Sequence, residues 1–182
     1  MILIAFGANL PGPDGCAAHE TCRRAIMAAG DLPGLRLEAV SRFYATAPIP
    51  VSDQPPYING VMRLSGAADP ARLLADVLAV ESRFGRTRSV PNAPRSLDLD
   101  LIAMGDLVRQ PPVPDPILPH PRMQDRAFVL VPLIDVAPAW RHPVLGRTAA
   151  DLLADLPDQA IELAEIQPFR AGLDASHATG RT

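Results

Sequence analysis

Strand-like and helical patterns follow one another along this chain in an order that few folds accommodate. Apolar residues alternate or run together in four stretches: ILIAFG (2–7), LRLEAVSRFYAT (35–46), YINGVMRLSG (57–66) and SLDLDLIAM (96–104). A helical pattern occupies two further stretches: residues 17–29 and DPARLLADVLAVESRFG (69–85). The predicted order of elements is therefore β-α-β-β-α-β.

The second of these helices has the clearest boundaries in the sequence. Asp69 can cap its first turn, Pro70 suits its first position, and Gly85 suits its end. Apolar residues between them recur at helical spacing, so one face of the helix is expected to pack on a sheet.

The predicted order of elements is typical of the split βαβ or ferredoxin-like arrangement. We therefore expect an α+β fold with an antiparallel sheet, helices on one face and extra C-terminal elements. Those elements are RMQDRAFVLVPLIDVAP (122–138), helical in parts, and RTAADLLADL (147–156), a short amphipathic helix. With 182 residues and no internal repeat or linker, we expect one domain over residues 1–168 and a flexible tail over 169–182.

Composition and charge exclude several functions. Apolar residues make up 48% of the chain, which is typical of a globular protein. Its net charge is −3, which does not favour binding to nucleic acid or to an anionic membrane. All 17 basic residues are arginines, which excludes a Walker A loop and a protein-kinase fold because both need a lysine. Codon bias is the simpler explanation for the missing lysine, although the arginine fork also suits phosphate.

Cysteine usage and hydropathy predict the compartment. Cys16 and Cys22 suit neither a disulfide framework nor a zinc site, and the N-terminal apolar run is too short for a signal peptide. No run approaches the roughly 20 apolar residues of a membrane span. We expect a cytoplasmic protein with reduced thiols, and a monomer.

Two aspartates within the last predicted strand suggest a metal site. Asp98 and Asp100 share one face of a strand while the leucines around them take the other, so two like charges lie about 7 Å apart. Magnesium prefers one or two protein carboxylates, with water and substrate phosphates completing its shell. The alternative is a solvent-facing strand edge whose aspartates merely keep it soluble.

Arginines flank this pair on both sides. Arg86, Arg88 and Arg95 lie in the loop before it, and Arg126 follows His120 downstream. Such a set suits a triphosphate held between metal and guanidinium groups, as in phosphoryl transfer. A single histidine is more often structural than catalytic, so His120 has a structural reading as well.

The loop APIPVSDQPP (47–56) precedes a second set of candidates. A proline-rich loop of this length inside a small domain is usually functional. Tyr57 and Asn59 follow it at strand spacing, where a ring can stack on a flat heterocycle and an amide can read its edge. Alternatively, Tyr57 belongs to the core and Asn59 is a polar residue at a strand end.

Four motifs occur in order and together carry a resemblance: FGANL, SRFYATAPIPVSDQPPYING, VESRFGRTRSVPNAPRSLDLDLI and PHPRMQDRAFVLVPLIDVAP. Over residues 1 to about 150, the chain resembles the 6-hydroxymethyl-7,8-dihydropterin pyrophosphokinase family of folate biosynthesis. The resemblance implies a ferredoxin-like α+β core and transfer of the β,γ-pyrophosphoryl group of ATP to the pterin hydroxymethyl group. AMP is released, two Mg2+ ions take part, and the substrates are small molecules.

The resemblance also implies a role for each matching residue. The catalytic residues would be Arg86, Arg95, Asp98 and Asp100, and the last two would bridge the metal ions. The pterin would be bound by Asn9, Thr46, Ile49, Tyr57, Asn59 and Phe128, with its ring between Tyr57 and Phe128. ATP would be bound by Glu81, Arg88, His120 and Arg126.

The chain departs from the family pattern at a few positions. The loop between Arg88 and Arg95 looks one residue shorter, and PNAPR replaces a tryptophan-glycine-proline-arginine run. Pro121 stands where a tyrosine often follows the histidine, and Asp115 where a base is common. These changes concern the loop over ATP rather than the strands beneath it.

Two other functions remain open from the residues alone. A different two-metal enzyme on the same kind of core, such as a palm-type nucleotidyl transferase or cyclase, would release pyrophosphate instead of AMP. A non-enzymatic module that binds a small ligand or RNA would need no magnesium. Fold alone does not separate these functions.

Overall fold

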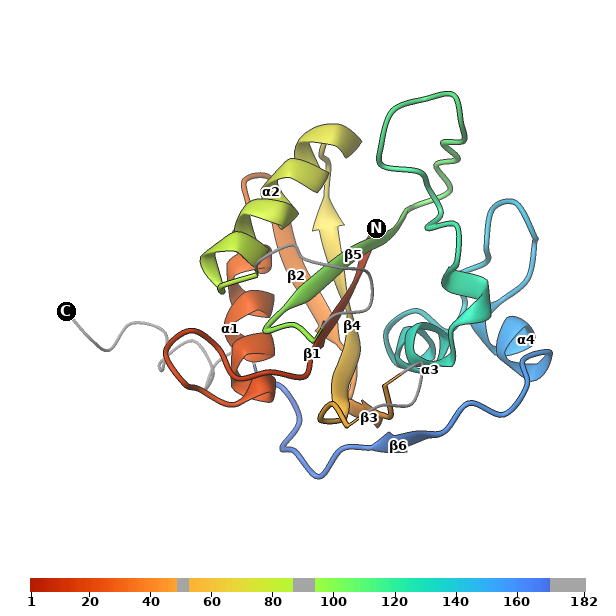
Figure 1. The fold of residues 1–182 in the computed structure, drawn as a ribbon. Coiled ribbons are helices and arrows are strands. Elements are labelled where there is room, and N and C mark those ends of the chain that lie inside the picture. Colours follow the sequence, from red (N-terminus) through yellow and green to blue (C-terminus); the bar gives the residue numbers. More distant parts are fainter. Residues whose placement is uncertain (49–52, 87–93, 171–182) are drawn as a thin grey trace.

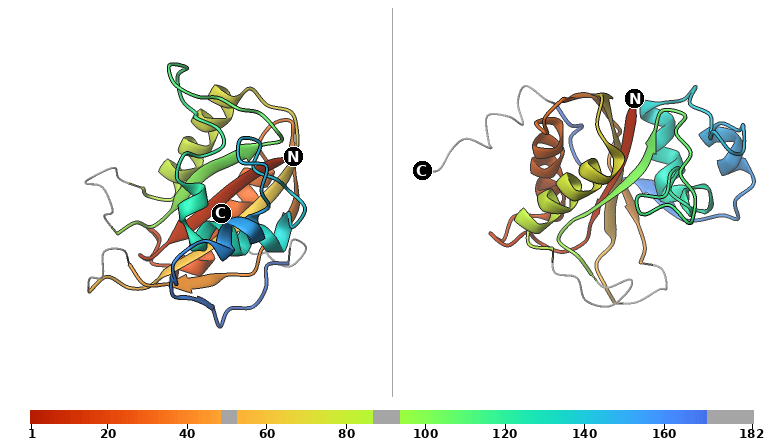
Figure 2. Two further views of the ribbon diagram at one scale, coloured as in Figure 1. Left: turned by 90° about the vertical axis from the view of Figure 1, so that its right-hand side faces the viewer. Right: turned by 90° about the horizontal axis from the view of Figure 1, so that it is seen from above.

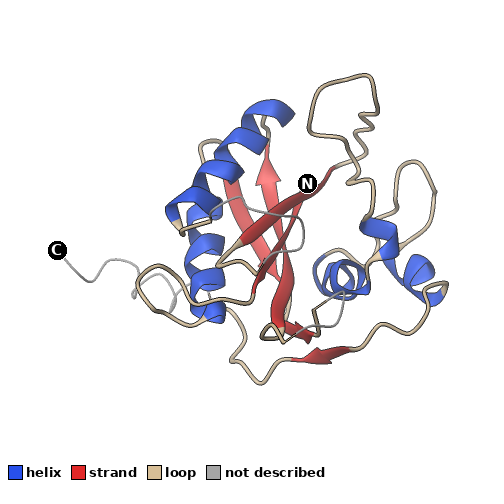
Figure 3. Ribbon diagram, viewed as in Figure 1, coloured by secondary structure: helices blue, strands red, loops and turns tan. Residues whose placement is uncertain are grey.

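The computed structural model describes residues 1–48, 53–86 and 94–170 (Figure 1). Its strands are β1 (Ile2–Ala8), β2 (Leu35–Val40), β3 (Tyr44–Thr46), β4 (Tyr57–Gly66), β5 (Asp98–Met104) and β6 (Ile161–Leu163). Its helices are α1 (Ala18–Gly30), α2 (Pro70–Arg83), the 3-10 turn η1 (Met123–Asp125), α3 (Ala127–Val136) and α4 (Ala149–Ala154). Figure 3 distinguishes the two kinds of element.

The strands form one open antiparallel sheet with the order β5-β1-β4-β3-β6, and β2 also pairs with β4. This confirms the predicted α+β class and the antiparallel sheet. The predicted strand over 35–46 is wrong in one respect, because it divides into β2 and β3. Val40 pairs with Met62 and Tyr44 with Asn59, so β4 has one residue fewer between these two pairs, which breaks the ladder.

Each face of the sheet carries its own core. Side chains alternate along β1, so Ile2, Ile4 and Phe6 pack with α1 and α2, whereas Leu3 and Ala5 pack with α3 and α4. Figure 2, seen from above, shows α1 and α2 on one side of the sheet and α3 on the other. The two helices between strands thus share a face as predicted, and the extra C-terminal helices cover the opposite face.

Helix α2 begins and ends as its sequence predicts. The Asp69 side chain accepts a hydrogen bond from the Arg72 backbone N–H at 2.9 Å, and Pro70 is the first helical residue. Gly85, with φ of 79°, follows the last turn in a conformation that favours glycine. The buried face of the helix carries Leu73 and Val77.

The segment 157–170 leaves α4, crosses the sheet edge and returns to the α1 face, as the blue trace below the sheet in Figure 1 shows. Ile166 and Phe169 pack against the core beneath α1 and α2. The other residues of the predicted tail, 171–182, lie outside the described part of the chain. No helix among the described residues is long and apolar enough to cross a membrane.

Candidate active site

Polar side chains gather at one end of the sheet, on the face that α3 covers. Gly7 of β1 pairs with Asp98 of β5 on one side and with Asn59 of β4 on the other, so the three residues form one row. Ala5 pairs with Asp100 and Val61 in the next such row. Residues directly opposite each other face the same side of a sheet, so Asp98, Asp100 and Asn59 share a face.

Gly7 leaves space in the middle of the first row. A Cβ atom at this position would stand 3.0 Å from the Asn59 Oδ1 atom. Two strand spacings, about 10 Å, separate the strands of Asp98 and Asn59, and the residue between them has no side chain. No role was predicted for Gly7, because its importance depends on the two strands that pair with β1.

The paired aspartates have the alternation that the sequence predicts. Leu97, Leu99 and Leu101 are buried on the α1–α2 face, whereas the Asp98 and Asp100 side chains are 23% and 36% exposed on the other. The strand thus separates its apolar side from its acidic side. The half-buried carboxylates need counter-charges because they repel each other.

Three of the predicted arginines supply those counter-charges. Arg86 Nη1 lies 2.5 Å from Asp98 Oδ1, and Arg95 Nη1 lies 2.5 Å from Asp98 Oδ2. Arg126 Nη1 lies 3.4 Å from Asp100 Oδ2. Arg88 lies outside the described residues. The structure therefore brings carboxylates and arginines together from three separate parts of the chain.

Glu81 supports this cluster from beneath. It is buried near the end of α2, accepts a hydrogen bond from the Leu99 backbone N–H at 2.6 Å, and pairs with Arg86. Burial raises the pKa of Glu81, although the Leu99 N–H and Arg86 act in the opposite direction. Glu81 thus links α2 to β5 and orients Arg86. Neither contact was predicted for Glu81, whose predicted role is ATP binding.

Asn9 joins three segments at the end of β1. Its backbone N–H donates to the Arg95 carbonyl at 3.0 Å, and its side-chain Oδ1 accepts from the Arg95 N–H at 2.9 Å. Its Nδ2 donates to the Gln54 side chain and to the Pro55 carbonyl, both at 3.2 Å. Asn9 is 4% exposed, so besides its predicted pterin contact it fixes the loops on both sides of the site.

The second set of candidates lies on β3 and β4. Asn59 Nδ2 donates to Thr46 Oγ1 at 2.8 Å, which fixes the orientation of the amide. The Tyr57 hydroxyl donates to Gln54 Oε1 at 3.5 Å. Gln54 was not predicted as a site residue, although its place in the DQPPYING motif offered a signal. The predicted residue Ile49 lies outside the described part of the chain.

Arg126 and Phe128 lie at the start of α3, which packs against β4. The Arg126 guanidinium lies 5.4 Å from the centre of the Phe128 ring, in cation–π geometry. Arg126 thus contacts both Asp100 and Phe128, and links the carboxylates to the ring that is predicted to hold the pterin.

His120 lies in the loop after β5, where its backbone N–H donates to the Ile102 carbonyl at 2.8 Å. Burial lowers the pKa of His120; Asp100 opposes this shift and two nearby arginines add to it. Its Nδ1 accepts from the Arg122 backbone N–H at 3.2 Å, so the proton of the neutral ring lies on Nε2. That group can donate to a phosphate oxygen. The two departures from the family pattern, Asp115 and Pro121, are exposed in the same loop.

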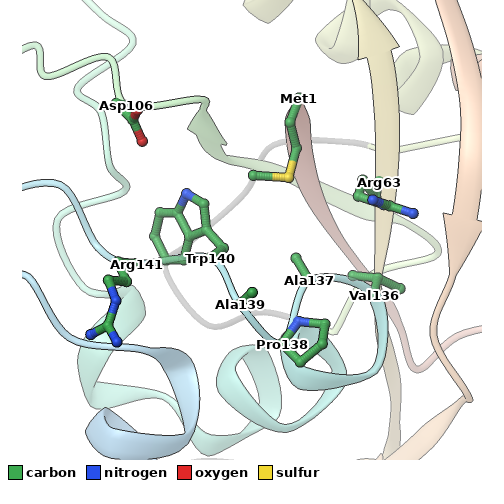
Figure 4. A pocket seen from close by; sticks show the side chains of 9 residues that line it. All are labelled: Met1, Arg63, Asp106, Val136, Ala137, Pro138, Ala139, Trp140 and Arg141. Atoms are coloured by element: carbon green, nitrogen blue, oxygen red, sulfur yellow. The ribbon is translucent and has the colours of Figure 1, made fainter.

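A separate hollow lies at the other end of the sheet (Figure 4). It has a volume of about 490 Å³, and Met1, Arg63 and Trp140 are among the residues that line it. Met1 precedes the first residue of β1, whereas the carboxylate row faces Gly7 near the end of the same strand. The hollow therefore does not belong to the candidate site.

Comparison with known proteins gives consistent matches. Residues 3–138 match the sequence model of the 7,8-dihydro-6-hydroxymethylpterin-pyrophosphokinase family. The chain is 40% identical over 161 residues to a 2-amino-4-hydroxy-6-hydroxymethyldihydropteridine pyrophosphokinase of Pseudomonas aeruginosa, covering 88% of this chain and 94% of that protein. It is 36% identical over 172 residues to a protein of the same name from Synechocystis, covering 94% and 82%. The folic acid synthesis protein fol1 of Schizosaccharomyces pombe is 31% identical over 160 residues, covering 88% of this chain and 21% of that longer protein.

Proposed function

The chain belongs to the 7,8-dihydro-6-hydroxymethylpterin-pyrophosphokinase family, and on this premise we propose its reaction. The enzyme transfers the β,γ-pyrophosphoryl group of ATP to the hydroxymethyl group of 6-hydroxymethyl-7,8-dihydropterin. The products are the pterin diphosphate and AMP, in folate biosynthesis. The observation that carries the proposal is the convergence of Arg86, Arg95 and Arg126 on Asp98 and Asp100.

The proposal includes several finer points. The core is ferredoxin-like, since the chain order β1-α1-(β2,β3)-β4-α2-β5 and the strand order β5-β1-β4-β2 fit that arrangement. The enzyme is a cytoplasmic monomer. It uses two Mg2+ ions together with ATP.

The donor set of the site fits magnesium better than a closed metal centre. Within residues 1–48, 53–86 and 94–170, no group of three or more His, Cys, Asp or Glu side chains is arranged to hold a metal ion. Asp98 and Asp100 therefore supply two carboxylates, and the phosphates of ATP and water would supply the other ligands. When bound, the ions would neutralise phosphate charge and lower the pKa of the attacking hydroxyl group.

Arg86 and Arg95 would exchange one anionic partner for another during the cycle. In the described structure both guanidinium groups pair with Asp98. When the triphosphate enters, they can turn to its oxygens and leave Asp98 free for metal. The positive charge stays close to the reacting phosphates, where it stabilises charge that develops in transfer. Glu81 holds Arg86 near this position through the exchange.

Two other parts of the site would bind the rest of the substrates. Arg88, His120 and Arg126 would contact the nucleotide side of ATP. Tyr57 and Phe128 would stack on the two faces of the pterin ring, as aromatic side chains do with flat heterocycles.

The pterin edge would be read by Asn59. One Nδ2 hydrogen of Asn59 is donated to Thr46, so the Oδ1 atom beside Gly7 is oriented to accept from a ring N–H. Asn9 and backbone groups near Thr46 and Ile49 would complete this edge.

The first experiment is product analysis with purified protein, ATP, Mg2+ and 6-hydroxymethyl-7,8-dihydropterin. We expect AMP only when the pterin and Mg2+ are both present. Asp98→Asn and Asp100→Asn should abolish AMP formation. Asp106→Asn is the matched control, since this exposed aspartate lies in the turn just after β5, at the opposite end of the strand.

The products also separate the alternatives. Pyrophosphate in place of AMP would indicate a nucleotidyl transferase or cyclase. Pterin binding without Mg2+ and without any product would indicate a binding module. Either result, obtained with folded protein, refutes the proposed reaction.

A further inference from the structure

The segment 157–170, which we call the C-terminal strap, contacts both sides of the candidate site. It lies beyond residue 138, where the match to the family ends. The strap follows α4 on the α3 face and passes along the edge of the sheet at β3 (Figure 1). The residues that the family resemblance singles out all precede it.

The side-chain amide of Gln159 makes two hydrogen bonds to one point of the backbone. Its Oε1 accepts from the Ala127 N–H at 3.0 Å, and its Nε2 donates to the Asp125 carbonyl at 3.1 Å. Asp125 is the last residue of η1 and Ala127 the first of α3, so the amide bridges the junction between two helices. The Ala127 N–H lies in the first turn of a helix, where backbone donors have no partner within the helix.

Arg126 lies between the two residues that Gln159 bonds, Asp125 and Ala127. Its side chain reaches Asp100 at 3.4 Å and lies over the Phe128 ring. The direction of both side chains depends on the backbone where η1 ends and α3 begins. A loose junction would let Arg126 and Phe128 move together.

The strap also holds the opposite side of the site. Its strand β6 pairs with β3, with Ile161 opposite Thr46, and the Ala164 N–H donates to the Phe43 carbonyl at 3.0 Å. Thr46 in turn orients the amide of Asn59. The strap therefore connects the backbone next to Phe128 with strand β3, which pairs with β4 at Asn59.

We propose that Gln159 is a positioning residue for substrate binding, which sets Arg126 and Phe128 through the η1–α3 junction. The inference rests on the proposed function, because it assumes that these two side chains contact ATP and the pterin. Gln159 touches neither substrate and takes no part in the transfer itself. Its loss should therefore weaken binding far more than it slows turnover at saturation.

The test compares Gln159→Ala with Thr148→Ala in the full chain. Thr148 caps α4 by accepting from the Asp151 N–H at 3.1 Å, so each variant removes an acceptor from the start of one helix. No predicted site residue lies on α4. Measurements are kcat and KM for ATP and for 6-hydroxymethyl-7,8-dihydropterin, together with the thermal unfolding midpoint and amide exchange across residues 123–131.

We expect Gln159→Ala to raise both KM values about five- to tenfold, with kcat changed less than about threefold. Exchange at the η1–α3 junction should be faster. Gln159→Glu keeps an acceptor for the Ala127 N–H but has no donor for the Asp125 carbonyl, so its KM values should lie between those of the wild type and Gln159→Ala. Thr148→Ala should lower the unfolding midpoint by a similar amount with KM unchanged.

Two results would overturn the inference while the wild type forms AMP. One is a pair of KM values in Gln159→Ala equal to those in Thr148→Ala. The other is a fall in kcat alone. A wild-type chain that forms no AMP would instead refute the proposed function, and the inference with it.

Discussion

Replacing each aspartate of the pair separately should show how strongly the arginines are bound to it. Asp98 accepts from Arg86 and Arg95 at 2.5 Å, whereas Asp100 has one longer contact with Arg126 at 3.4 Å. The two aspartate carboxylates repel each other by about 2 kcal/mol at a separation of about 7 Å and an effective dielectric constant near 20. Asp98→Asn and Asp100→Asn remove the same repulsion, so this contribution cancels when the two variants are compared.

The remaining difference comes from the arginine contacts. Asp98 offers a separate oxygen to each arginine, whereas an asparagine keeps only one acceptor oxygen, so Asp98→Asn loses one of these two hydrogen bonds. A hydrogen bond to a charged group contributes about 1.5–3 kcal/mol. Asp100 uses one oxygen for its single contact with Arg126, and the oxygen that Asp100→Asn keeps can accept from the same arginine. We therefore expect the free energy of unfolding of Asp98→Asn to be lower than that of Asp100→Asn by about 2 kcal/mol.

Urea denaturation at pH 7 without metal or nucleotide measures this difference, and Asp106→Asn serves as the surface control. AMP formation should be lost in both site variants despite their different stabilities. If Asp98→Asn proved as stable as Asp100→Asn, the close pairing of Arg86 and Arg95 with Asp98 would be wrong. If either variant kept more than a tenth of wild-type turnover, its carboxylate would not hold a metal that the transfer requires.

Three further predictions follow from other contacts of the site. Burial raises the pKa of Glu81 above its unfolded value, so the contribution of Glu81 to stability falls as pH rises from the unfolded pKa to the folded pKa. Glu81→Gln should remove this dependence, so in urea titrations from pH 5 to 8 the free energy of unfolding of the wild type should exceed that of the variant by a margin that grows toward low pH. A constant margin would contradict the prediction. Thr46→Val removes the acceptor that orients Asn59, so KM for the pterin should rise about tenfold with little change in KM for ATP. Equal changes in the two KM values would argue against an orienting role for Thr46. Millimolar Mg2+ alone should leave the unfolding midpoint nearly unchanged, because two carboxylates bind the ion weakly. Mg2+ together with ATP should raise the midpoint. A large shift with Mg2+ alone would mean that the protein supplies more ligands than Asp98 and Asp100.

Local patterns in the sequence predicted the elements and the two faces of the last strand. The alternation in SLDLDLIAM separates aspartates from leucines because successive side chains of a strand point in opposite directions. Asp69, Pro70 and Gly85 fix the ends of α2 through hydrogen bonds and dihedral angles that involve only neighbouring residues. The division of 35–46 into β2 and β3 was not predictable in this way, since it depends on the register with β4.

Local patterns along the chain therefore predict which residues can carry charge, stack or cap, and on which side of an element each lies. Which of these residues contact one another depends on how the chain folds. Asn9 bonds to Arg95 across 86 positions, and Gln159 reaches the η1–α3 junction from 34 positions away. Periodicity and capping concern residues within a few positions of one another, whereas these contacts arise when β1 pairs between β4 and β5 and the strap folds back over the sheet edge.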